Sequence, residues 1–488
     1  MPVRKLTNRR EFLKLTALGA AGAAVVTACA PATAPTPTPV PPTKPAEAPK
    51  PAAPTATPVP ASTKPAATAA PAPTPTAATK PAEKVPSPGV VEIRFMNRGG
   101  KAAFDIHDQV VAAFTKATPN VKVKVEPVLE GAWDQKLLTA IASGTEPDTV
   151  MNGFGSWQAF AKRGQLLDIS DYVKRDVKLD DFLPIANQSE IYKGKFYSWH
   201  YNGGPMALFY NKEAFDKDKI PHPDANWTWA KYWEVAKKLT IDRAGKRPGE
   251  TGFDPRRVQQ YGTLSLTGSW YIYVWQKGAE VFTKDKDRIL LDDPKVLDTI
   301  QELADLVVKD GIWPNPLYPE VAPSDFVTGR VAMGLQGYWM VARAVPAKFA
   351  WDVAPMPKSE WVNKRVGFGY YSGNSVLKST KHPEESWLLL RFFGGEPGQK
   401  IMGEGGLTYP AVLSVARDFK PKLPENVGAF LADYENMRFF EVNAYITELA
   451  KFNQLLNPEL EKVWLGQAKA KDVLPPIVPK LNAIIAES

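Results

Sequence analysis

The sequence predicts an α/β protein that folds as two lobes. Strand-like and helix-like patterns alternate from residue 90 onward, which is typical of a mostly parallel sheet covered by helices. All 14 Trp lie at or after Trp133, so the part of the chain able to form a core comprises about 400 of the 488 residues. That length exceeds what one hydrophobic core usually supports. We therefore expect two lobes.

The alternation is clearest at the start of this folding part. Apolar residues recur there with period two in the strand-like segments and on one face in the helix-like segments. The expected order is strand, helix, strand, helix, strand, over residues 90–95, 105–116, 121–125, 133–143 and 147–151. Ligands bind beyond the carboxyl ends of the strands in such sheets, so loops 96–100 and 152–157 are expected at the mouth of a site.

Helix-start signals recur in the second half. Thr228 is expected to cap a helix that runs to residue 239, and Asp293 followed by a proline opens another that runs to residue 308. A strand is expected over residues 330–336 and a helix over 383–393. The glycine-rich residues 394–400 lack the Gly-Lys-Ser/Thr ending of a phosphate loop, and we interpret them as a turn after that helix.

The N-terminus carries the features of an export signal. Residues 1–14 are basic, and Leu15–Ala28 is an uncharged run too short to span a bilayer. Arg9 and Arg10 resemble the twin-arginine export signal, although Asn8 stands where Ser or Thr is more usual. Residues 1–28 are therefore predicted to be an export signal peptide. The sequence does not decide between the twin-arginine export route and the general export route.

Cys29 ends this apolar run and is the only cysteine of the chain. The preceding small residues resemble the bacterial lipobox, which implies cleavage before Cys29 and attachment of a diacylglycerol to its thiol. Two acyl chains hold a protein firmly at a membrane. A single cysteine also excludes a disulfide framework and thiol catalysis in the folding part. We expect Cys29 to anchor the protein at the outer face of the cell membrane.

A spacer follows the anchor. Residues 31–88 contain 19 Pro, no aromatic residue and only three Val as larger apolar residues. Such a segment cannot bury enough surface to offset its ordering entropy, so residues 29–88 are expected to be a disordered, extended stalk. A glycosylated stalk is the alternative.

The charge of the chain lies mainly in these N-terminal segments. The formal net charge is +8, but residues 89–488 hold 50 basic and 49 acidic groups. A folding part this close to neutral has no bulk electrostatic reason to bind a phosphate backbone. Nucleic acid is therefore not an expected partner.

Several stretches of the folding part resemble the family 1 extracellular solute-binding proteins, the maltose-binding-like receptors of ABC importers. Each stretch alone is short and unspecific, but their order across residues 90–410 is specific. The matching stretches are Val111–Val125, Trp133–Leu137, Ala142–Asp148, Leu166–Ile169, Tyr192–Tyr197, Leu208–Lys212, Trp227–Trp229, Phe326–Met333, Trp351–Pro355 and Lys381–Glu385.

The resemblance implies a type II periplasmic-binding-protein fold, the Venus-flytrap arrangement, in which each lobe is a sheet flanked by helices and ligand binds between the lobes. Crossings between lobes would lie near residues 198–203 and 366–372. Lobe 1 would then comprise residues 89–200 plus about 370–412, and lobe 2 about 203–366 plus 413–488. The implied ligand is a carbohydrate, the implied partners are membrane permease subunits, and we expect a monomer without cofactor.

Candidate site residues follow from the chemistry of sugars. Sugars present apolar C–H faces and a rim of hydroxyls, so their sites need flat aromatic surfaces and planar polar groups. Aromatic residues beside turn residues, together with polar residues at the expected mouth, give the candidates Asn97, Arg98, Trp133, Asp134, Phe154, Tyr201, Asn202, Trp270, Tyr271, Tyr338, Trp339, Tyr370 and Tyr371.

Each of these candidates also has a structural interpretation. A Trp is more often a core residue, and core or lobe-surface packing is the expectation for Trp227, Trp229, Trp233, Trp313 and Trp387. Asp134 is either a ligand contact or a solvated helix residue. Arg98 either binds an acidic sugar or forms a salt bridge within a lobe.

The sequence offers no catalytic or metal site. The four His have no zinc-ligand spacing. A secreted glycoside hydrolase would share the export signal and the aromatic residues but needs two carboxylates across a sugar ring. No such pair stands out among the 49 acidic groups, and no enzyme is expected. The other alternative is a receptor for a non-sugar solute. Arg98 and Arg343 are compatible with a polyol phosphate as that solute.

Overall fold

The computed structural model describes residues 89–488 except 153–156, 315–325, 370, 433, 440–441 and 443–444. The export signal with Arg9 and Arg10, the predicted anchor Cys29 and the spacer lie outside the described residues, as do Phe154 and Tyr370. Within the described part, no helix has both the length and the apolar character needed to cross a bilayer.

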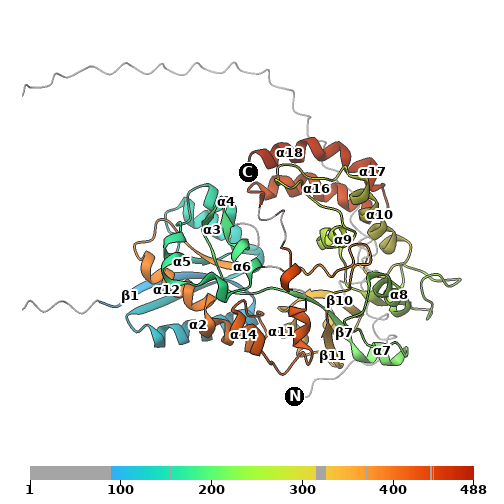
Figure 1. Ribbon diagram of the computed structural model, residues 1–488, viewed down its shortest axis with the longest axis horizontal. Coiled ribbons are helices and arrows are strands. Elements are labelled where there is room, and N and C mark those ends of the chain that lie inside the picture. Colours follow the sequence, from blue (N-terminus) through green and yellow to red (C-terminus); the bar gives the residue numbers. More distant parts are fainter. Residues whose placement is uncertain are drawn as a thin grey trace, which may run out of the picture. The chain divides into compact units, whose positions relative to one another are not determined.

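The first lobe is built on a five-stranded sheet with the order β2-β1-β3-β12-β6. Parallel pairs join β1 (Val91–Gly99) to β2 (Val121–Leu129) and to β3 (Thr149–Met151). Antiparallel pairs join β12 (Gly373–Val376) to β3 and to β6 (Trp199–His200). The sheet therefore combines a parallel N-terminal part with a strand that lies more than 200 residues later in the chain (Figure 1).

Helices cover this sheet. The buried face of α2 (Lys101–Ala117) carries Ile106, Val110 and Phe114 at helical spacing, and it packs against Phe95 of β1 in one apolar cluster. The other helices that follow or precede strands of this sheet are α3 (Trp133–Ala142), α4 (Trp157–Lys162), α5 (Ser170–Asp176), α6 (Pro184–Ser189), α12 (Pro383–Gly394) and α13 (Glu396–Glu404), and a small hairpin pairs β4 (Ile191–Tyr192) with β5 (Lys195–Phe196).

The interpretation of residues 394–400 as a turn is wrong, because α13 begins at Glu396. The glycines allow two helices to pack closely: a Cβ at Gly398 would lie 2.4 Å from the backbone oxygen of Phe392 in α12. Gln399 is fully buried, and its Oε1 accepts a hydrogen bond of 2.9 Å from the backbone N–H of Val412. The glycines of this segment therefore serve packing.

The second lobe is built on a sheet with the order β11-β7-β10-β9-β8, formed by β11 (Trp351–Ala354), β7 (Met206–Asn211), β10 (Val331–Gly337), β9 (Val258–Thr263) and β8 (Ile241–Asp242). In this sheet only β9 and β10 pair in parallel, and the other pairs are antiparallel. The prediction of a mostly parallel sheet is therefore wrong for this lobe. Strand β7 carries the chain away from the first lobe, whereas β10 runs back toward it and ends beside Met206, the start of β7.

The helix caps predicted for the second half are present. The Thr228 hydroxyl accepts a hydrogen bond of 3.3 Å from the backbone N–H of Lys231 at the start of α8 (Trp229–Leu239). The Asp293 carboxylate accepts one of 2.8 Å from Lys295 at the start of α10 (Pro294–Val308). Each bond satisfies a backbone donor that has no partner within its helix.

The core of the second lobe extends to the end of the chain. The C-terminal helices α16 (Leu449–Trp464), α17 (Ala470–Val473) and α18 (Val478–Ala486) share one apolar cluster with α8, α9 (Trp270–Gln276) and α10 (Figure 1). The remaining helices are α7 (Lys212–Lys217), α11 (Met340–Ala344) and α14 (Leu413–Asp418). The five Trp expected in the core or at a lobe surface are all buried: Trp227, Trp229, Trp233, Trp313 and Trp387.

The chain passes between the two sheets at residues 201–205 and again between β11 and β12. The two passages are hydrogen bonded to each other. The backbone N–H of Tyr201 donates to the Ser372 oxygen at 3.1 Å, the N–H of Ser372 donates to Asn202 Oδ1 at 2.9 Å, and the N–H of Met206 donates to the Phe368 oxygen at 2.9 Å. The lobes are therefore joined by this paired connection and by the later chain that leads from α13 to the C-terminal helices.

Candidate functional site

A cavity of about 690 Å³, here called the interlobe cavity, has walls from both lobes. The carboxyl ends of β1, β9 and β10 point to it, as is general for ligand sites in α/β sheets. The crossing segments form its base through Tyr201, Asn202 and Ser372, and a later segment, Leu407–Tyr409, completes the wall.

The first-lobe wall is the turn from β1 into α2, comprising Arg98, Gly99, Gly100 and Lys101. Gly99 has φ of +152°, and a Cβ there would lie 2.8 Å from the Cβ of Ala103, so this tight turn requires glycine. The turn directs the N-terminus of α2 at the cavity. No side chain caps that helix end, and its first turn holds no acidic residue.

Two buried polar side chains in the wall have no hydrogen-bond partner among the residues that the structure describes, although most such groups in folded proteins are paired. They are His107, which is 2% exposed, and Thr408, which is 5% exposed. Burial, and secondarily the charge of Arg98, lowers the pKa of His107 to about 4, so its imidazole is neutral near pH 7. The neutral ring can donate one hydrogen bond and accept another.

The second-lobe wall contains Trp339, which follows β10 and whose side chain is only partly buried. Its indole lies directly over Gly337, where a Cβ would stand 1.8 Å from the ring. The neighbouring Tyr338 is fully buried, and its hydroxyl donates to the Gly403 oxygen at 3.4 Å. Burial raises the pKa of Tyr338 well above its ordinary value. Of these two aromatic residues, Trp339 is the one that is partly exposed.

Polar residues line the same cavity as this indole. The loop after β9 contributes Ser265 and Ser269, and the end of β10 contributes Gln336. Together with Asn202, they provide hydroxyl and amide groups that both donate and accept hydrogen bonds. An accessible indole beside neutral polar groups suits a polyhydroxylated ligand.

The segment that ends at Tyr409 contacts both lobes. A Cβ at Gly405 would lie 2.8 Å from the side chain of Ile106 in α2, and the backbone N–H of Ala342 in α11 donates to the Gly406 oxygen at 3.2 Å. The backbone N–H of Gly203 donates to the Tyr409 oxygen at 2.7 Å. This wall was not predicted from the sequence, although the closely spaced glycines at 403, 405 and 406 indicate close backbone packing.

Five of the sequence-predicted residues line the interlobe cavity: Arg98, Tyr201, Asn202, Tyr338 and Trp339. Asn97 lies beside the wall and is fully buried, and neither atom of its amide has a hydrogen-bond partner. Lys101, His107, Ser265, Ser269, Gln336 and Thr408 line the cavity but were not among the candidates. Polar residues in loops, such as Ser265 and Thr408, have no periodic pattern that could have identified them, and Lys101, His107 and Gln336 belong to regular elements whose cavity-facing positions the sequence does not mark.

The other described candidates do not line the cavity. Trp133 is 1% exposed and packs edge-on against Phe160 in the first-lobe core, while its neighbour Asp134 is exposed on α3. Trp270 and Tyr271 are buried in the second-lobe core. Tyr371 is also buried, and its hydroxyl contacts the sulfur of Met437 at 3.3 Å. The apolar surface of each ring is already covered by the protein.

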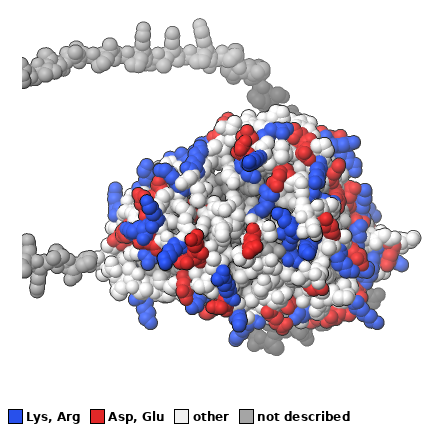
Figure 2. All heavy atoms as spheres, in the orientation of Figure 1, with Lys and Arg blue, Asp and Glu red and all other residues white. Residues whose placement is uncertain are grey.

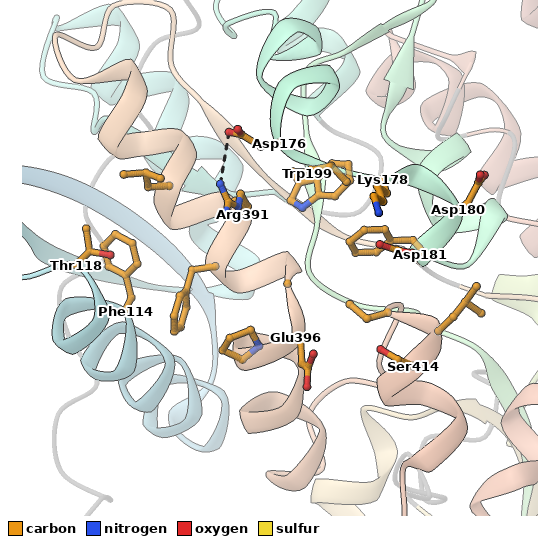
Figure 3. A pocket seen from close by; sticks show the side chains of 18 of the residues that line it. Phe114, Thr118, Asp176, Lys178, Asp180, Asp181, Trp199, Arg391, Glu396 and Ser414 are labelled. Carbon is orange, nitrogen blue, oxygen red and sulfur yellow. Dashed lines mark ion pairs between the residues drawn. The ribbon is translucent and has the colours of Figure 1, made fainter.

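A second cavity, here called the first-lobe hollow, has a volume of about 760 Å³ and is lined by parts of α2, α12, α13, α14 and residues 176–182 (Figure 3). Its charges are of both signs, and its most enclosed carboxylate, that of Asp176, has several partners. Asp176 binds Arg175 at 2.7 Å, accepts a hydrogen bond from Trp387 Nε1 at 2.7 Å and lies 3.6 Å from Arg391. These partners, Arg175 first, lower the pKa of Asp176 to about 2.

The interlobe cavity has a different charge composition. Arg98, Lys101 and Arg343 are among its described lining residues, and no Asp or Glu is. Lys101 is paired at 2.8 Å with Asp105 on the exposed side of α2. On the face of the molecule shown in Figure 2, by contrast, acidic and basic side chains are intermingled.

The family model for bacterial extracellular solute-binding proteins matches residues 101–400. The chain belongs to this family. A solved structure, the ABC substrate-binding protein Lmo0181 from Listeria monocytogenes in complex with cycloalternan, has a TM-score of 0.70 and 23% identity, covering 81% of this chain and 99% of that one. The described part therefore has the fold of a two-lobed binding protein, as the sequence predicted.

Two relatives extend this comparison. The maltotriose-binding protein of Pyrococcus abyssi is 24% identical over 290 residues, which are 57% of each chain. The sn-glycerol-3-phosphate-binding periplasmic protein UgpB of Brucella melitensis is 23% identical over 399 residues, covering 74% of this chain and 86% of that protein. The family thus includes receptors named for a neutral sugar and for a phosphorylated polyol.

Proposed function

We propose that the protein is the receptor of an ABC importer and captures a carbohydrate in the interlobe cavity. The observation that carries this proposal is the accessible indole of Trp339, set among neutral polar side chains at the carboxyl ends of strands from two lobes. The indole would stack on the apolar face of a sugar ring. Asn202, Gln336 and the serines of the loop after β9 would bind its hydroxyls.

Capture would proceed by closure of the lobes about their paired connection. A ligand that contacts both walls stabilises the closed form, and by no more than the difference between its affinities for the closed and open forms. The hydrogen bonds that join Tyr201 and Asn202 to Ser372 lie at the base of the cavity and leave its two walls free to approach. The closed form would then be recognised by the permease subunits of the importer.

The family is extracytoplasmic, and we propose that this member is held at the outer face of the cell membrane by a lipid on Cys29. The residues before Cys29 resemble a lipobox, and a long proline-rich spacer separates it from the lobes. Replacing Cys29 with Ser is expected to release the protein into the soluble fraction after export. Retention of that variant in the membrane fraction would contradict the anchor.

A panel of mono- and oligosaccharides tests the carbohydrate proposal by thermal shift. A ligand present at 100 times its dissociation constant is expected to raise the free energy of unfolding by about 2.7 kcal/mol. A stabilising sugar should be recovered unchanged after the titration. No stabilisation by any sugar of the panel would contradict the proposal.

The glycoside hydrolase alternative makes the opposite prediction, which is cleavage of a glycoside in the same samples. Glycoside hydrolysis needs two carboxyl groups that face each other across the bound sugar. None of the described residues that line the interlobe cavity carries a carboxyl group. We therefore propose that the protein binds its ligand without chemical change.

A further inference from the structure

Four buried polar side chains of the first-lobe wall and of the core behind it have no hydrogen-bond partner among the residues that the structure describes. They are Asn97, His107, Asn374 and Thr408, and each is at most 5% exposed. Both polar atoms of the two amides and of the imidazole are unpaired, and so is the Thr408 hydroxyl. Because buried polar groups in folded proteins are usually paired, this group of residues needs an explanation.

The register of the first sheet places the two asparagines on one of its faces. Side chains two residues apart on a strand point to the same side, so Asn97 shares the side of Phe95. Asn374 is paired with Met151 on the neighbouring strand, and directly opposite residues share a face. Phe95 and Met151 both belong to the apolar cluster that contains the buried face of α2. Both amides therefore lie on the face of the sheet that the helices of this cluster cover.

His107 and Thr408 connect this region with the interlobe cavity. His107 is on α2, and its ring lies edge-on to Phe393 of the same cluster, with the ring centroids 6.2 Å apart. Thr408 belongs to the segment that packs on α2, where a Cβ at Gly405 would lie 2.8 Å from Ile106. Both residues also line the cavity. The unpaired groups therefore extend from the cavity wall into the first lobe.

These groups share one hydrogen-bonding character. An amide, a hydroxyl and a neutral imidazole each donate and accept hydrogen bonds, and none of them carries a charge. Burial lowers the pKa of His107 to about 4, so its imidazole is neutral near pH 7. A carboxylate can only accept and an ammonium can only donate, whereas a hydroxyl does both. The ligand group that complements these side chains is therefore a hydroxyl.

We propose that His107 and Thr408 form a hydroxyl-specific subsite, in which the hydroxyls of one sugar ring bind. Asn97 and Asn374 bind water behind them and keep the subsite polar. This subsite determines which sugar is accepted, because a buried polar group that meets no hydroxyl stays unpaired at a cost in free energy. Stacking on an indole, by contrast, accepts any apolar sugar face. The inference rests on the proposed carbohydrate function and adds the residues that determine its specificity.

Deoxy sugars test the subsite by isothermal titration of the full chain. D-glucose is compared with its 2-, 3-, 4- and 6-deoxy analogues, and D-galactose with its 2- and 6-deoxy analogues. The sugar that stabilises the protein most in the thermal-shift panel is added with its own deoxy analogues. Loss of the hydroxyl that enters the subsite is expected to weaken binding about tenfold or more, because it leaves a buried group unpaired. Loss of a hydroxyl elsewhere on the ring should change the affinity much less.

The variant Thr408→Val distinguishes a ligand subsite from a structural role. Valine has nearly the shape of threonine but no hydroxyl, so the ligand-free protein loses an unpaired polar group. Its melting temperature should therefore rise by about 1–2 °C. The affinity for the intact sugar should fall about fivefold or more, since one hydrogen bond is lost. The deoxy sugar that lacks the matching hydroxyl should bind the variant and the wild type about equally.

The matched control is Thr240→Val in the second lobe. Thr240 is fully buried, and its hydroxyl donates to the Ala236 oxygen at 2.8 Å and accepts from the backbone N–H of Gly262 at 3.0 Å. Because this hydroxyl is paired, the control variant should melt at a lower temperature than the wild type. Its affinity for every sugar should be unchanged, since Thr240 does not line the cavity.

The outcomes distinguish this inference from the proposed function. One deoxy position that binds weakly to the wild type, with the difference lost in Thr408→Val, supports the subsite. Deoxy analogues that all bind as tightly as their parent sugars would overturn the inference and leave the carbohydrate receptor standing. Unchanged sugar affinity in Thr408→Val would also overturn it, whatever the melting temperature of the variant. Absence of binding for every sugar contradicts the proposed function and this inference with it.

Discussion

The interlobe cavity and the first-lobe hollow are of similar size, about 690 and 760 Å³, yet the polar groups in their walls differ in their hydrogen-bond partners. In the hollow, Asp176 is bound by a guanidinium and by an indole N–H. In the interlobe cavity, His107 and Thr408 are buried without partners. The two cavities therefore differ in how their buried polar groups are satisfied, although their volumes are similar.

The two cavities also differ in how they respond to motion. The hollow is lined by parts of α2, α12, α13 and α14 and by residues 176–182, and none of its described lining residues belongs to the second sheet. The interlobe cavity takes its walls from both lobes, so a change in the angle between the lobes changes its width. Ligand binding in the interlobe cavity can therefore be coupled to a change in the angle between the lobes, which is the kind of change that a membrane partner would recognise.

The largest effect is expected from Trp339→Ala. Loss of the indole removes the apolar surface on which the ligand stacks, and affinity for a ligand found by thermal shift should fall roughly ten- to hundredfold. Isothermal titration measures this fall. The control is Trp361→Ala, which removes an indole that is 45% exposed and lies over Lys277, outside the cavity. Equal losses for both variants would contradict the role of Trp339.

Gly337→Ala tests how the indole is held. The new Cβ would coincide with the ring, so Trp339 must move, and affinity should fall about tenfold if the ring position matters. Titration combined with tryptophan fluorescence reports both changes. Gly268→Ala is the control, because a Cβ there meets nothing within 4 Å. Unchanged affinity together with a shifted emission would show that stacking does not need this geometry.

Asp176→Asn tests the pairing in the first-lobe hollow. The pKa of Asp176 is lowered from about 3.9 in the unfolded chain to about 2, so its contribution to stability is present above pH 4 and is lost as the pH falls through 2. The variant should melt roughly 2 °C below the wild type at pH 7. The two melting curves should converge near pH 2.

Asp180→Asn is the matched control for this change, since Asp180 lines the same hollow and is exposed. Its melting temperature should follow the wild type across the whole range from pH 2 to 7. A difference between wild type and Asp176→Asn that persists undiminished at pH 2 would mean that packing, not charge, is responsible.

The smallest effect is expected from Arg391→Gln. Arg391 lies 3.6 Å from Asp176 and both are near the surface, and such pairs contribute at most about 1 kcal/mol. Ligand affinity should change less than twofold, as titration can determine. A tenfold loss of affinity would instead make the first-lobe hollow the binding site and reverse the comparison between the two cavities.

The sequence by itself determined most local structure of the folding part. Residues 121–125 alternate and residues 330–336 are mostly apolar, as in strands, and the side-chain oxygens of Thr228 and Asp293 accept hydrogen bonds from backbone N–H groups two or three residues along the chain. These signals are local, so they can be recognised without knowing the rest of the fold. The ordered stretches likewise identified the family.

The tertiary structure decided which aromatic residues face the cavity. Trp270 and Trp339 both lie beside a glycine-containing turn, yet one is covered by the second-lobe core and the other is left accessible. The direction of the second-lobe strands and the wall at residues 407–409 were decided in the same way. Each depends on contacts between segments far apart in the chain, and such contacts leave no periodic trace in the sequence.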